Sequence, residues 1–278
     1  MVSIADAIQI RALKTIAELK AVEDLQVEVW GCSEREILPS LTLIPLLDIG
    51  GVLIGAFDEQ ELVGFVLGFP GFEAGQPILH SDMLAVRAEY RSRGLGYRLK
   101  LEQRSLALAN GIEKITWTFD PLQAANAHLN FGKLGVIADR YKVNYYGETS
   151  SALHRTGTDR LWVTWRLRSE RVKQRVELHV STVANIPSPD FAAIPAPLKV
   201  GPDGEPQTFP VDAKQDLIRI EIPHNINAIV NVDETSARRW RTATREKFTA
   251  ALAEHFVVSD FFKAQEPAHP GFYLLTRN

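Results

Sequence analysis

Arg91-Ser-Arg-Gly94-Leu-Gly96 stands between an apolar run at residues 80–86 and an amphipathic segment at residues 97–110. This order predicts a strand, a glycine loop and a helix. Gly94 and Gly96 let the backbone turn with its N–H groups pointing inward, and the N-terminus of the helix adds a positive dipole. The stretch therefore indicates a site for an anion such as a pyrophosphate. An ordinary strand-to-helix turn is the alternative, because short loops with two glycines are common.

Hydrophobic periodicity predicts further elements on both sides of this loop. We expect strands at residues 8–13, 51–57, 62–69, 80–86, 114–119, 142–147 and 160–167, and helices at 14–30, 97–110 and 123–134. Asp58-Glu-Gln-Glu61 is a polar loop of hairpin length between the second and third strands. The resulting order is β-α-β-β-β-α-β-α-β-β.

This order, with the glycine loop opening the helix after the fourth strand, resembles the GNAT superfamily of acyl-CoA N-acyltransferases over about residues 8–168. Residues 84–96, Leu-Ala-Val-Arg-Ala-Glu-Tyr-Arg-Ser-Arg-Gly-Leu-Gly, are similar to the family's central segment, and residues 130–135, Asn-Phe-Gly-Lys-Leu-Gly, to a later one. The resemblance implies an α/β (α+β) fold with a mixed central sheet flanked by helices. Residues 64–70, 117–121 and 159–160 resemble a two-part bacterial subgroup of acetyltransferase-like proteins whose function is not characterised.

The resemblance also implies an acyl-CoA cosubstrate, acetyl-CoA being the first expectation. In the family, backbone groups of the fourth strand contact the pantetheine arm and the loop holds the pyrophosphate. The residues assigned to CoA in this way are Leu84, Val86, Arg91, Arg93, Gly94, Leu95, Gly96, Tyr97, Asn126 and Phe131. Two of them depart from the family pattern. Many members have a tyrosine that protonates the CoA thiolate where Phe131 stands, and the family's asparagine corresponds to the position of Ala124 rather than Asn126.

Acyl transfer to an amine needs a base for the ammonium proton, donors for the oxyanion and an acid for the thiolate. His80, Asp82 and Leu84 alternate along the expected fourth strand, so we expect them to share one face. The resemblance places the reactive end of the cofactor there. Asp82 is then the expected general base and His80 the second choice, while the N–H of Leu84 or a neighbour would polarise the thioester carbonyl. Hydrogen bonding to a neighbouring loop is the alternative role for both side chains.

The acid for the thiolate must come from elsewhere, because Phe131 has no proton to give. Tyr145 or Tyr146 is the expected acid, since adjacent residues on the strand expected at 142–147 face opposite ways and one of them should point inward. Asp120, at the end of the fifth strand, either binds the acceptor amine or only forms the turn before Pro121.

The composition excludes several other classes of function. With 278 residues, 45% hydrophobic and a net charge of −3, the chain gives no reason to expect nucleic acid or an anionic membrane as a partner. The single cysteine, Cys32, and seven histidines without metal-ligand spacing predict no disulfide and no metal. We expect a cytoplasmic enzyme, because no apolar stretch approaches the roughly 20 residues of a membrane span and no signal peptide is evident.

The domain expectation is a GNAT domain at residues 1–168, a charged and then proline-rich linker at 169–212, and a smaller α+β domain at 213–278. The charged run at 166–175 is expected to be a solvated edge or the start of the linker. The last part should contain strands at 217–222, 256–262 and 272–276 around a helix at 234–255 with Asp233 as its N-cap, which echoes half a GNAT domain.

Two faces of this helix carry predictions. An inner stripe is expected from the apolar and small residues at helical spacing, Ala237, Trp240, Thr244, Phe248 and Leu252. A second face carries Arg238, Arg241 and Arg245, which are either solvated or capture an anionic group.

Two functions remain open at this stage. One is N-acyl transfer from acyl-CoA to a small amine or amino-acid-like acceptor. The other is a non-catalytic acyl-CoA sensor or regulatory protein, which Phe131 favours. An oligomer is compatible with both.

Overall fold

The computed structural model describes residues 8–31, 33, 35–147, 155–181, 191–263 and 269–277. The described residues form two compact units, one that ends at Trp117 and one that begins at Thr118. This division falls inside a strand, whereas the sequence places a boundary at residue 168. The three-part organisation expected from the sequence therefore stays a prediction.

The first unit is an antiparallel sheet with one parallel addition. Its elements are β1 (Gln9–Ala12), α2 (Ile16–Trp30), α3 (Ser40–Asp48), β2 (Val52–Asp58), β3 (Glu61–Glu73), β4 (Gln76–Val86), the 3₁₀ turn η1 (Ala88–Tyr90), α4 (Leu95–Ala109) and β5 (Lys114–Phe119). The strands β1, β2, β3 and β4 pair in chain order and antiparallel, and β5 joins β4 in parallel. The mixed sheet expected from the sequence is confirmed.

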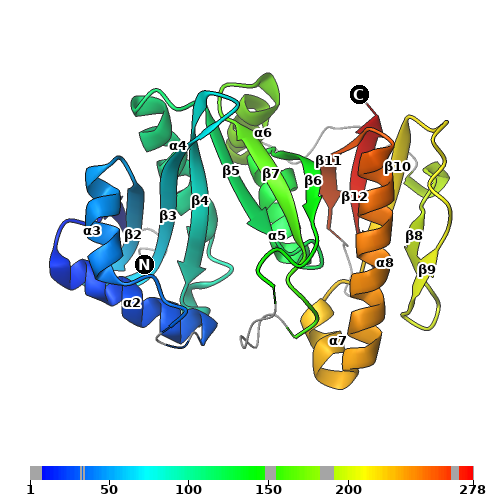
Figure 1. Cartoon of the computed structure of the whole chain (residues 1–278), viewed down its shortest axis with the longest axis horizontal. Helices are drawn as coiled ribbons and strands as arrows, with labels where there is room; N and C mark the ends of the chain where they lie inside the picture. Colours follow the sequence, from blue (N-terminus) through cyan, green and yellow to red (C-terminus); the bar gives the residue numbers. More distant parts are fainter. Residues whose placement is uncertain are drawn as a thin grey trace. The chain divides into compact units, whose positions relative to one another are not determined.

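The two faces of this sheet carry different helices (Figure 1). Apolar side chains of α2 and α3 pack on one face, around Phe65 and Leu67 of β3. α4 covers the other face, where Gly68 leaves room for the helix: a Cβ on Gly68 would lie 3.0 Å from Nε2 of Gln103. The glycine loop at residues 91–96, which precedes α4, is thus attached to the face opposite α2 and α3.

The second unit contains the remaining elements. They are α5 (Ala124–Ala127), the π-helical turn η2 (His128–Leu134), β6 (Ile137–Lys142), β7 (Arg160–Arg166), α6 (Glu170–Ser181), η4 (Phe191–Ala193), β8 (Leu198–Val200), β9 (Pro206–Thr208), β10 (Leu217–Ile222), α7 (Ile226–Val232), α8 (Glu234–Ala253), β11 (Phe256–Phe262) and β12 (Gly271–Arg277). Its strands are ordered β7-β6-β11-β12-β10-β8-β9. The strands near the C-terminus therefore continue the sheet that β6 and β7 begin.

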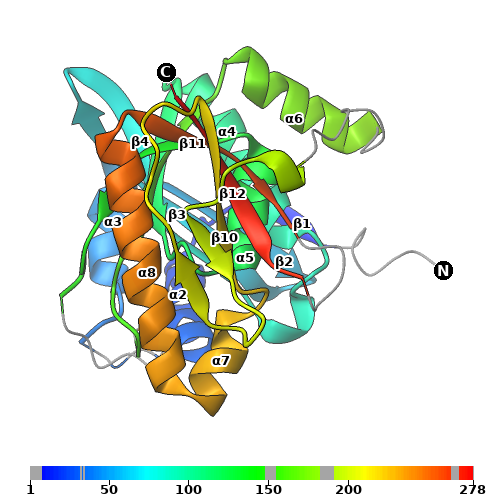
Figure 2. The same cartoon turned by 90° about the vertical axis from the view of Figure 1, so that its right-hand side faces the viewer.

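α8 packs along this second sheet (Figure 2), and the sequence signals for it are confirmed. The carboxylate of Asp233 accepts hydrogen bonds from the amides of Thr235 and Ser236, as an N-cap does. The expected inner stripe is buried except for Leu252, which is half-buried. α8 ends two residues before the expected position, and α7 was not expected.

One local prediction is wrong, and a second is confirmed with a local change. The strand expected at residues 142–147 is instead β6, which ends at Lys142 and is followed by a turn in which Asn144 has a φ of 45°. The carboxylate of Asp159 accepts the Asn144 amide at 2.9 Å and stabilises this turn. The helix expected at 123–134 is present, but from His128 onward it widens to a π-helical turn.

The charged run at 166–175 is partly solvated, as expected: Arg166, Arg168 and Lys173 are exposed, whereas Arg171 and Arg175 are half-buried. It leads into α6, whose arginines reach carbonyl groups of neighbouring elements. Arg171 donates to the carbonyl of Gly135 at 3.2 Å, and Arg175 donates to that of Gly132 at 3.3 Å and pairs with Asp260. Of the proline-rich stretch, the described residues from 191 onward contribute the short strands β8 and β9.

Candidate functional site

A bulge interrupts β4 at the residue expected to be the base. Met83 pairs with Leu67 of β3, but the next pair joins Ser81 to Gly68, so Asp82 is the extra residue. The bulge also changes the faces: His80 pairs with Phe69, whereas Leu84 pairs with Val66. Since Phe69 and Val66 are three residues apart on β3, the expectation that His80 and Leu84 share a face is wrong.

β4 separates from β5 immediately before this bulge. The two strands pair only through Leu79 with Ile115 and His80 with Thr116. Nδ1 of His80 and Oγ1 of Thr116 share a hydrogen bond of 3.0 Å at this last pair. Burial and the positive charge of Lys100 lower the pKa of His80, which therefore stays neutral at pH 7. Beyond His80, β4 makes no further pair with β5 along this edge.

Asp82 lies on this edge and is exposed. Although its side chain reaches solvent, the protein around it partly desolvates the carboxylate and raises its pKa. A raised pKa makes a carboxylate a stronger base, which suits proton abstraction. Leu84 and Val86 follow on the same strand and are half-buried.

The loop from Arg91 to Gly96 has the backbone conformation that an anion site needs. Ser92 and Gly94 have φ angles of 61° and 77°, and Gly94 caps α4 without any side-chain hydrogen bond to the helix. The first amide that bonds back is that of Arg98, to the carbonyl of Gly94 at 3.1 Å. The amides of Leu95 and Gly96 come earlier and have no carbonyl in the helix to bond to.

The side chains of the loop keep this geometry and add charge. Leu95 is buried, which anchors the start of α4, whereas Arg91 and Arg93 are exposed. Arg91 donates to the carbonyl of Val86 at 3.0 Å and Arg93 lies 5.4 Å from the ring of Tyr90. Tyr97 is half-buried, and burial raises its pKa. Both arginines can therefore contact a phosphate without giving up a buried hydrogen-bond partner.

The remaining predicted site residues belong to the second unit. Asn126 is exposed on α5, and Phe131 is fully buried in η2, with its ring edge-on to that of Tyr273 at 5.7 Å. Tyr145 and Tyr146 are not on a strand: they lie in the turn after β6 and are 41% and 48% exposed. The structure thus groups the β4 residues with the loop in one unit, and Asn126, Phe131 and the tyrosines in the other.

Asp120 is engaged by the protein itself. Its carboxylate accepts the amide of Leu122 at 2.9 Å, which is the expected turn, and both of its oxygens accept hydrogen bonds from Arg241 at 2.8 and 2.7 Å. Burial alone would lower the pKa of Arg241, but the charge of Asp120 outweighs this effect and raises it. The turn explains Asp120 without an acceptor amine.

A second carboxylate, Asp159, holds a similar position beside α8. Arg245 donates to both of its oxygens at 2.8 Å, and Tyr141 donates at 2.9 Å. Burial raises the pKa of Asp159, but these hydrogen bonds outweigh it and the net pKa is lowered. On the arginine face of α8, Arg241 and Arg245 thus pair with carboxylates of neighbouring segments, whereas Arg238 pairs with Glu234 on the surface.

Sequence reasoning missed a buried polar group behind β4. Nζ of Lys100, on α4, donates to Oγ of Ser81 at 2.6 Å and lies 3.8 Å from the ring of Trp117. Desolvation lowers the pKa of Lys100 to about 7. A lysine on the inner face of an amphipathic helix is the signal that could have identified it, since lysine is almost never fully buried.

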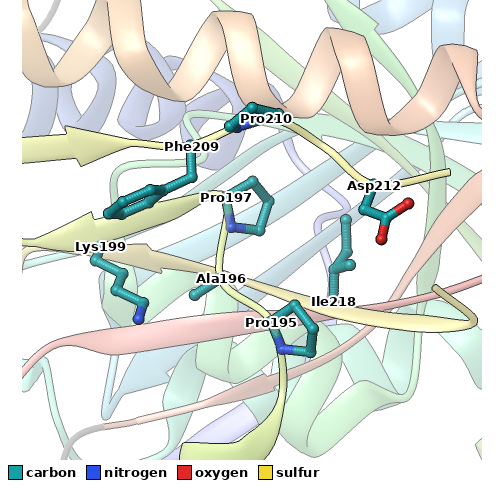
Figure 3. Close-up of a pocket in the computed structure, with 8 residues that line it drawn as sticks. All are labelled: Pro195, Ala196, Pro197, Lys199, Phe209, Pro210, Asp212 and Ile218. Carbon is teal, nitrogen blue, oxygen red and sulfur yellow. The ribbon is translucent and has the colours of Figure 1, made fainter. Parts of the chain in front are cut away.

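A hollow of about 230 Å³ lies in the second unit, and none of its lining residues is a predicted site residue (Figure 3). Its lining is formed by Pro195, Ala196, Pro197, Lys199, Phe209, Pro210, Asp212 and Ile218. Within the described residues, no group of three metal-binding side chains is found, and no helix is long and apolar enough to cross a membrane.

The chain is similar to known proteins over part of its length. Residues 19–135 match the model of the acetyltransferase (GNAT) family. Among solved structures, the ribosomal-protein-S18-alanine N-acetyltransferase from Escherichia coli is 16% identical with a TM-score of 0.46, covering 58% of this chain and 95% of that one. Aminoglycoside 6'-acetyltransferase type Ii is 18% identical with a TM-score of 0.47, covering 58% and 99%. The NatC complex bound to Gag peptide and CoA is 14% identical with a TM-score of 0.47, covering 57% of this chain and 98% of that one. No curated protein matches the sequence.

The family match spans the bulged β4, the glycine loop, α4 and the helical segment that ends at Gly135. These elements follow one another in the order that the sequence predicts. Over residues 19–135 the chain is therefore similar to the acetyltransferase (GNAT) family.

Proposed function

We propose that the protein transfers an acyl group, most simply acetyl, from CoA to the nitrogen of a small amine or amino-acid-like acceptor. The observation that carries the proposal is the glycine loop on the N-terminus of α4, within the same unit as the bulged and partly unpaired edge of β4.

The loop suits the pyrophosphate of CoA. The amides of Leu95 and Gly96 supply donors, the helix N-terminus supplies a positive dipole, and Arg91 and Arg93 supply positive charge from the same loop. The β4 edge from Leu84 to Val86 would pair with the amide groups of the pantetheine arm. In the second unit, Asn126 is proposed to contact CoA as well.

The reaction needs one proton acceptor and one proton donor. Asp82, directly or through water, would take the proton of the acceptor ammonium, with His80 as the second candidate. The neutral amine then attacks the thioester carbonyl, whose developing negative charge the N–H of Leu84 or a neighbour would stabilise. The C–N bond forms, the C–S bond breaks, and the CoA thiolate takes a proton. Tyr145 or Tyr146 is the proposed donor.

A non-catalytic acyl-CoA sensor is the second candidate. The observation in its favour is Phe131, which is fully buried against Phe119 and Tyr273 and has no proton to give. CoA binding is common to both functions, so turnover decides between them.

An amine panel with acetyl-CoA tests the proposal. Spermidine, an aminoglycoside, free amino acids and short peptides would each be assayed for release of the CoA thiol, and acetyl-CoA binding would be measured by calorimetry. The matched variant is Gly96→Glu, whose bulk and negative charge at the helix N-terminus should abolish acetyl-CoA binding while circular dichroism stays unchanged. Equal affinity in variant and parent would remove the CoA assignment. Binding without turnover of any amine would favour the sensor.

A further inference from the structure

Lys100 is a buried cation without a carboxylate partner. Its residue is 2% exposed, and its contacts are Oγ of Ser81 at 2.6 Å, Oε1 of Gln103 at 3.3 Å and the ring of Trp117 at 3.8 Å. In the part of the chain that the structure describes, no ion pair to Lys100 is found. Burying a charge is costly unless it is paired, so a merely structural role would be served as well by an apolar side chain.

The acidic groups on the strands that pack against α4 are engaged elsewhere or point to solvent. The engaged ones are Asp58, which accepts from Tyr90, Glu61, which pairs with Arg87, and Glu73, which pairs with Lys114. Arg11 of β1 pairs with Glu18, and Asp82 is exposed. The titratable group that feels the charge of Lys100 is His80, whose pKa this charge lowers.

The contact of Lys100 with Ser81 joins two parts of the candidate site. Lys100 is on α4, one turn after Gly96 of the glycine loop, and Ser81 is the residue immediately before the bulged Asp82. Ser81 and Asp82 together oppose Gly68 of β3. Gly68 has no side chain, which admits Gln103 to its place beside Lys100. The ammonium group of Lys100 therefore links the bulge at Asp82 to α4, the helix that follows the glycine loop.

We propose that Lys100 is a positioning residue for acyl transfer: its ammonium, bonded to Ser81, sets the position of Asp82 relative to the N-terminus of α4. This inference rests on the proposed function. The ammonium donates to both Ser81 and Gln103 and lies over the face of Trp117. The neutral amine loses the cation–π attraction and one donor, so the protonated form holds the bulge more firmly.

The proposal makes acyl transfer sensitive to pH near neutrality. Because desolvation lowers the pKa of Lys100 to about 7, the ammonium is present below this pH and is lost above it. The favourable position of Asp82 should then be lost as the pH rises through about 7. CoA binding, which uses the amides and arginines of the loop, should not depend on Lys100.

The first test follows the backbone amide of Asp82 by NMR in the protein without ligand. In the parent, its chemical shift should change with a midpoint near pH 7. Lys100→Met should abolish this change and raise the pKa of His80. Ser81→Ala, which removes only a hydroxyl group, should also abolish the pH-dependent change of the Asp82 amide. It replaces Lys100→Met as the test if that variant fails to fold. Lys114→Met is the matched control on β5 and should leave the Asp82 titration unchanged.

The second test compares turnover of acetyl-CoA with an amine identified in the panel. The ratio of the kcat of the parent to that of Lys100→Met, taken at each pH, cancels the ionisation of the acceptor. It should be about tenfold at low pH, the effect of one hydrogen bond to a charged group, and should decline above neutrality. The Kd for acetyl-CoA should stay within about twofold of the parent's, a difference of under half a kcal/mol.

The outcomes separate this inference from the proposed function. An Asp82 amide that titrates identically in the parent and the variants, a kcat ratio that does not vary with pH, or loss of acetyl-CoA binding in Lys100→Met would overturn the role of Lys100. Failure of every amine in the panel would instead refute the enzymatic function, while the NMR titration would still decide whether Lys100 positions Asp82.

Discussion

The buried ion pair between Asp120 and Arg241 gives a direct stability test. Asp120→Asn keeps the size of the side chain but leaves the guanidinium of Arg241, 4% exposed, without its carboxylate. Two hydrogen bonds of 2.8 and 2.7 Å lose their charged acceptor. Removing one partner of a buried pair lowers the free energy of unfolding by about 3–5 kcal/mol. With a urea dependence of roughly 1–3 kcal/mol/M, the unfolding midpoint should fall by about 1 M or more.

Urea unfolding followed by tryptophan fluorescence measures this effect, since Trp240 is fully buried in the same helix as Arg241. Glu234→Gln is the control, because the pairs of Glu234 with Arg238 and Arg155 are on the surface and the loss of each should cost under about 1 kcal/mol. Asp120→Asn combined with Arg241→Met removes both charges and should recover part of the loss. If Asp120→Asn costs no more than the control, the reasoning about burial is refuted.

Three further predictions concern the loop, the base and the second unit. Gly94→Val and Gly111→Val both place a side chain at a positive φ with no atom within 4 Å, so each should cost about 1–2 kcal/mol of stability, but only Gly94→Val should weaken acetyl-CoA binding in calorimetry. Asp82→Asn should lower turnover by roughly 10² to 10⁴, less at high pH where the amine is already neutral. Because the pKa of Asp82 is raised in the folded protein, its charge opposes folding above that pKa, and Asp82→Asn should be no less stable than the parent at pH 7. If Asp82→Asn keeps the turnover of the parent, the role of general base passes to His80 or to water. A fragment of residues 1–170 lacks the β11 partner of β6 and should aggregate in size-exclusion chromatography; a soluble, fully active fragment would contradict this.

Much of the fold could be predicted because its signals are local. Apolar periodicity identified most strands, and the N-cap of α8 lies beside the helix it starts. The glycine loop was recognisable because Gly94 adopts a conformation that other residues rarely do. The bulge at Asp82 could not be predicted in this way, since alternation of polar and apolar residues does not show where one residue is inserted.

Long-range contacts explain the other errors. The turn that holds Tyr145 and Tyr146 is stabilised by Asp159, which lies 15 residues after Asn144 in the chain. The arginines of α6 look solvated in the sequence, but Arg171 and Arg175 bond to carbonyl groups of η2 and its end. Partners of this kind come from tertiary structure, and no spacing within the run reveals them.

The packing of Phe131 against Tyr273 links two positions that are far apart in the sequence. Phe131 is fully enclosed, and the ring of Tyr273 stands at 90° to it while its hydroxyl donates to the carbonyl of Pro121 at 2.6 Å. A tyrosine at position 131 would add a hydroxyl inside this aromatic cluster, where a polar group without a partner costs about 1–3 kcal/mol. Phe131→Tyr therefore requires a compensating change on β12 that makes room for the hydroxyl or offers it a partner, so one strand of the C-terminal part decides which side chain position 131 can carry.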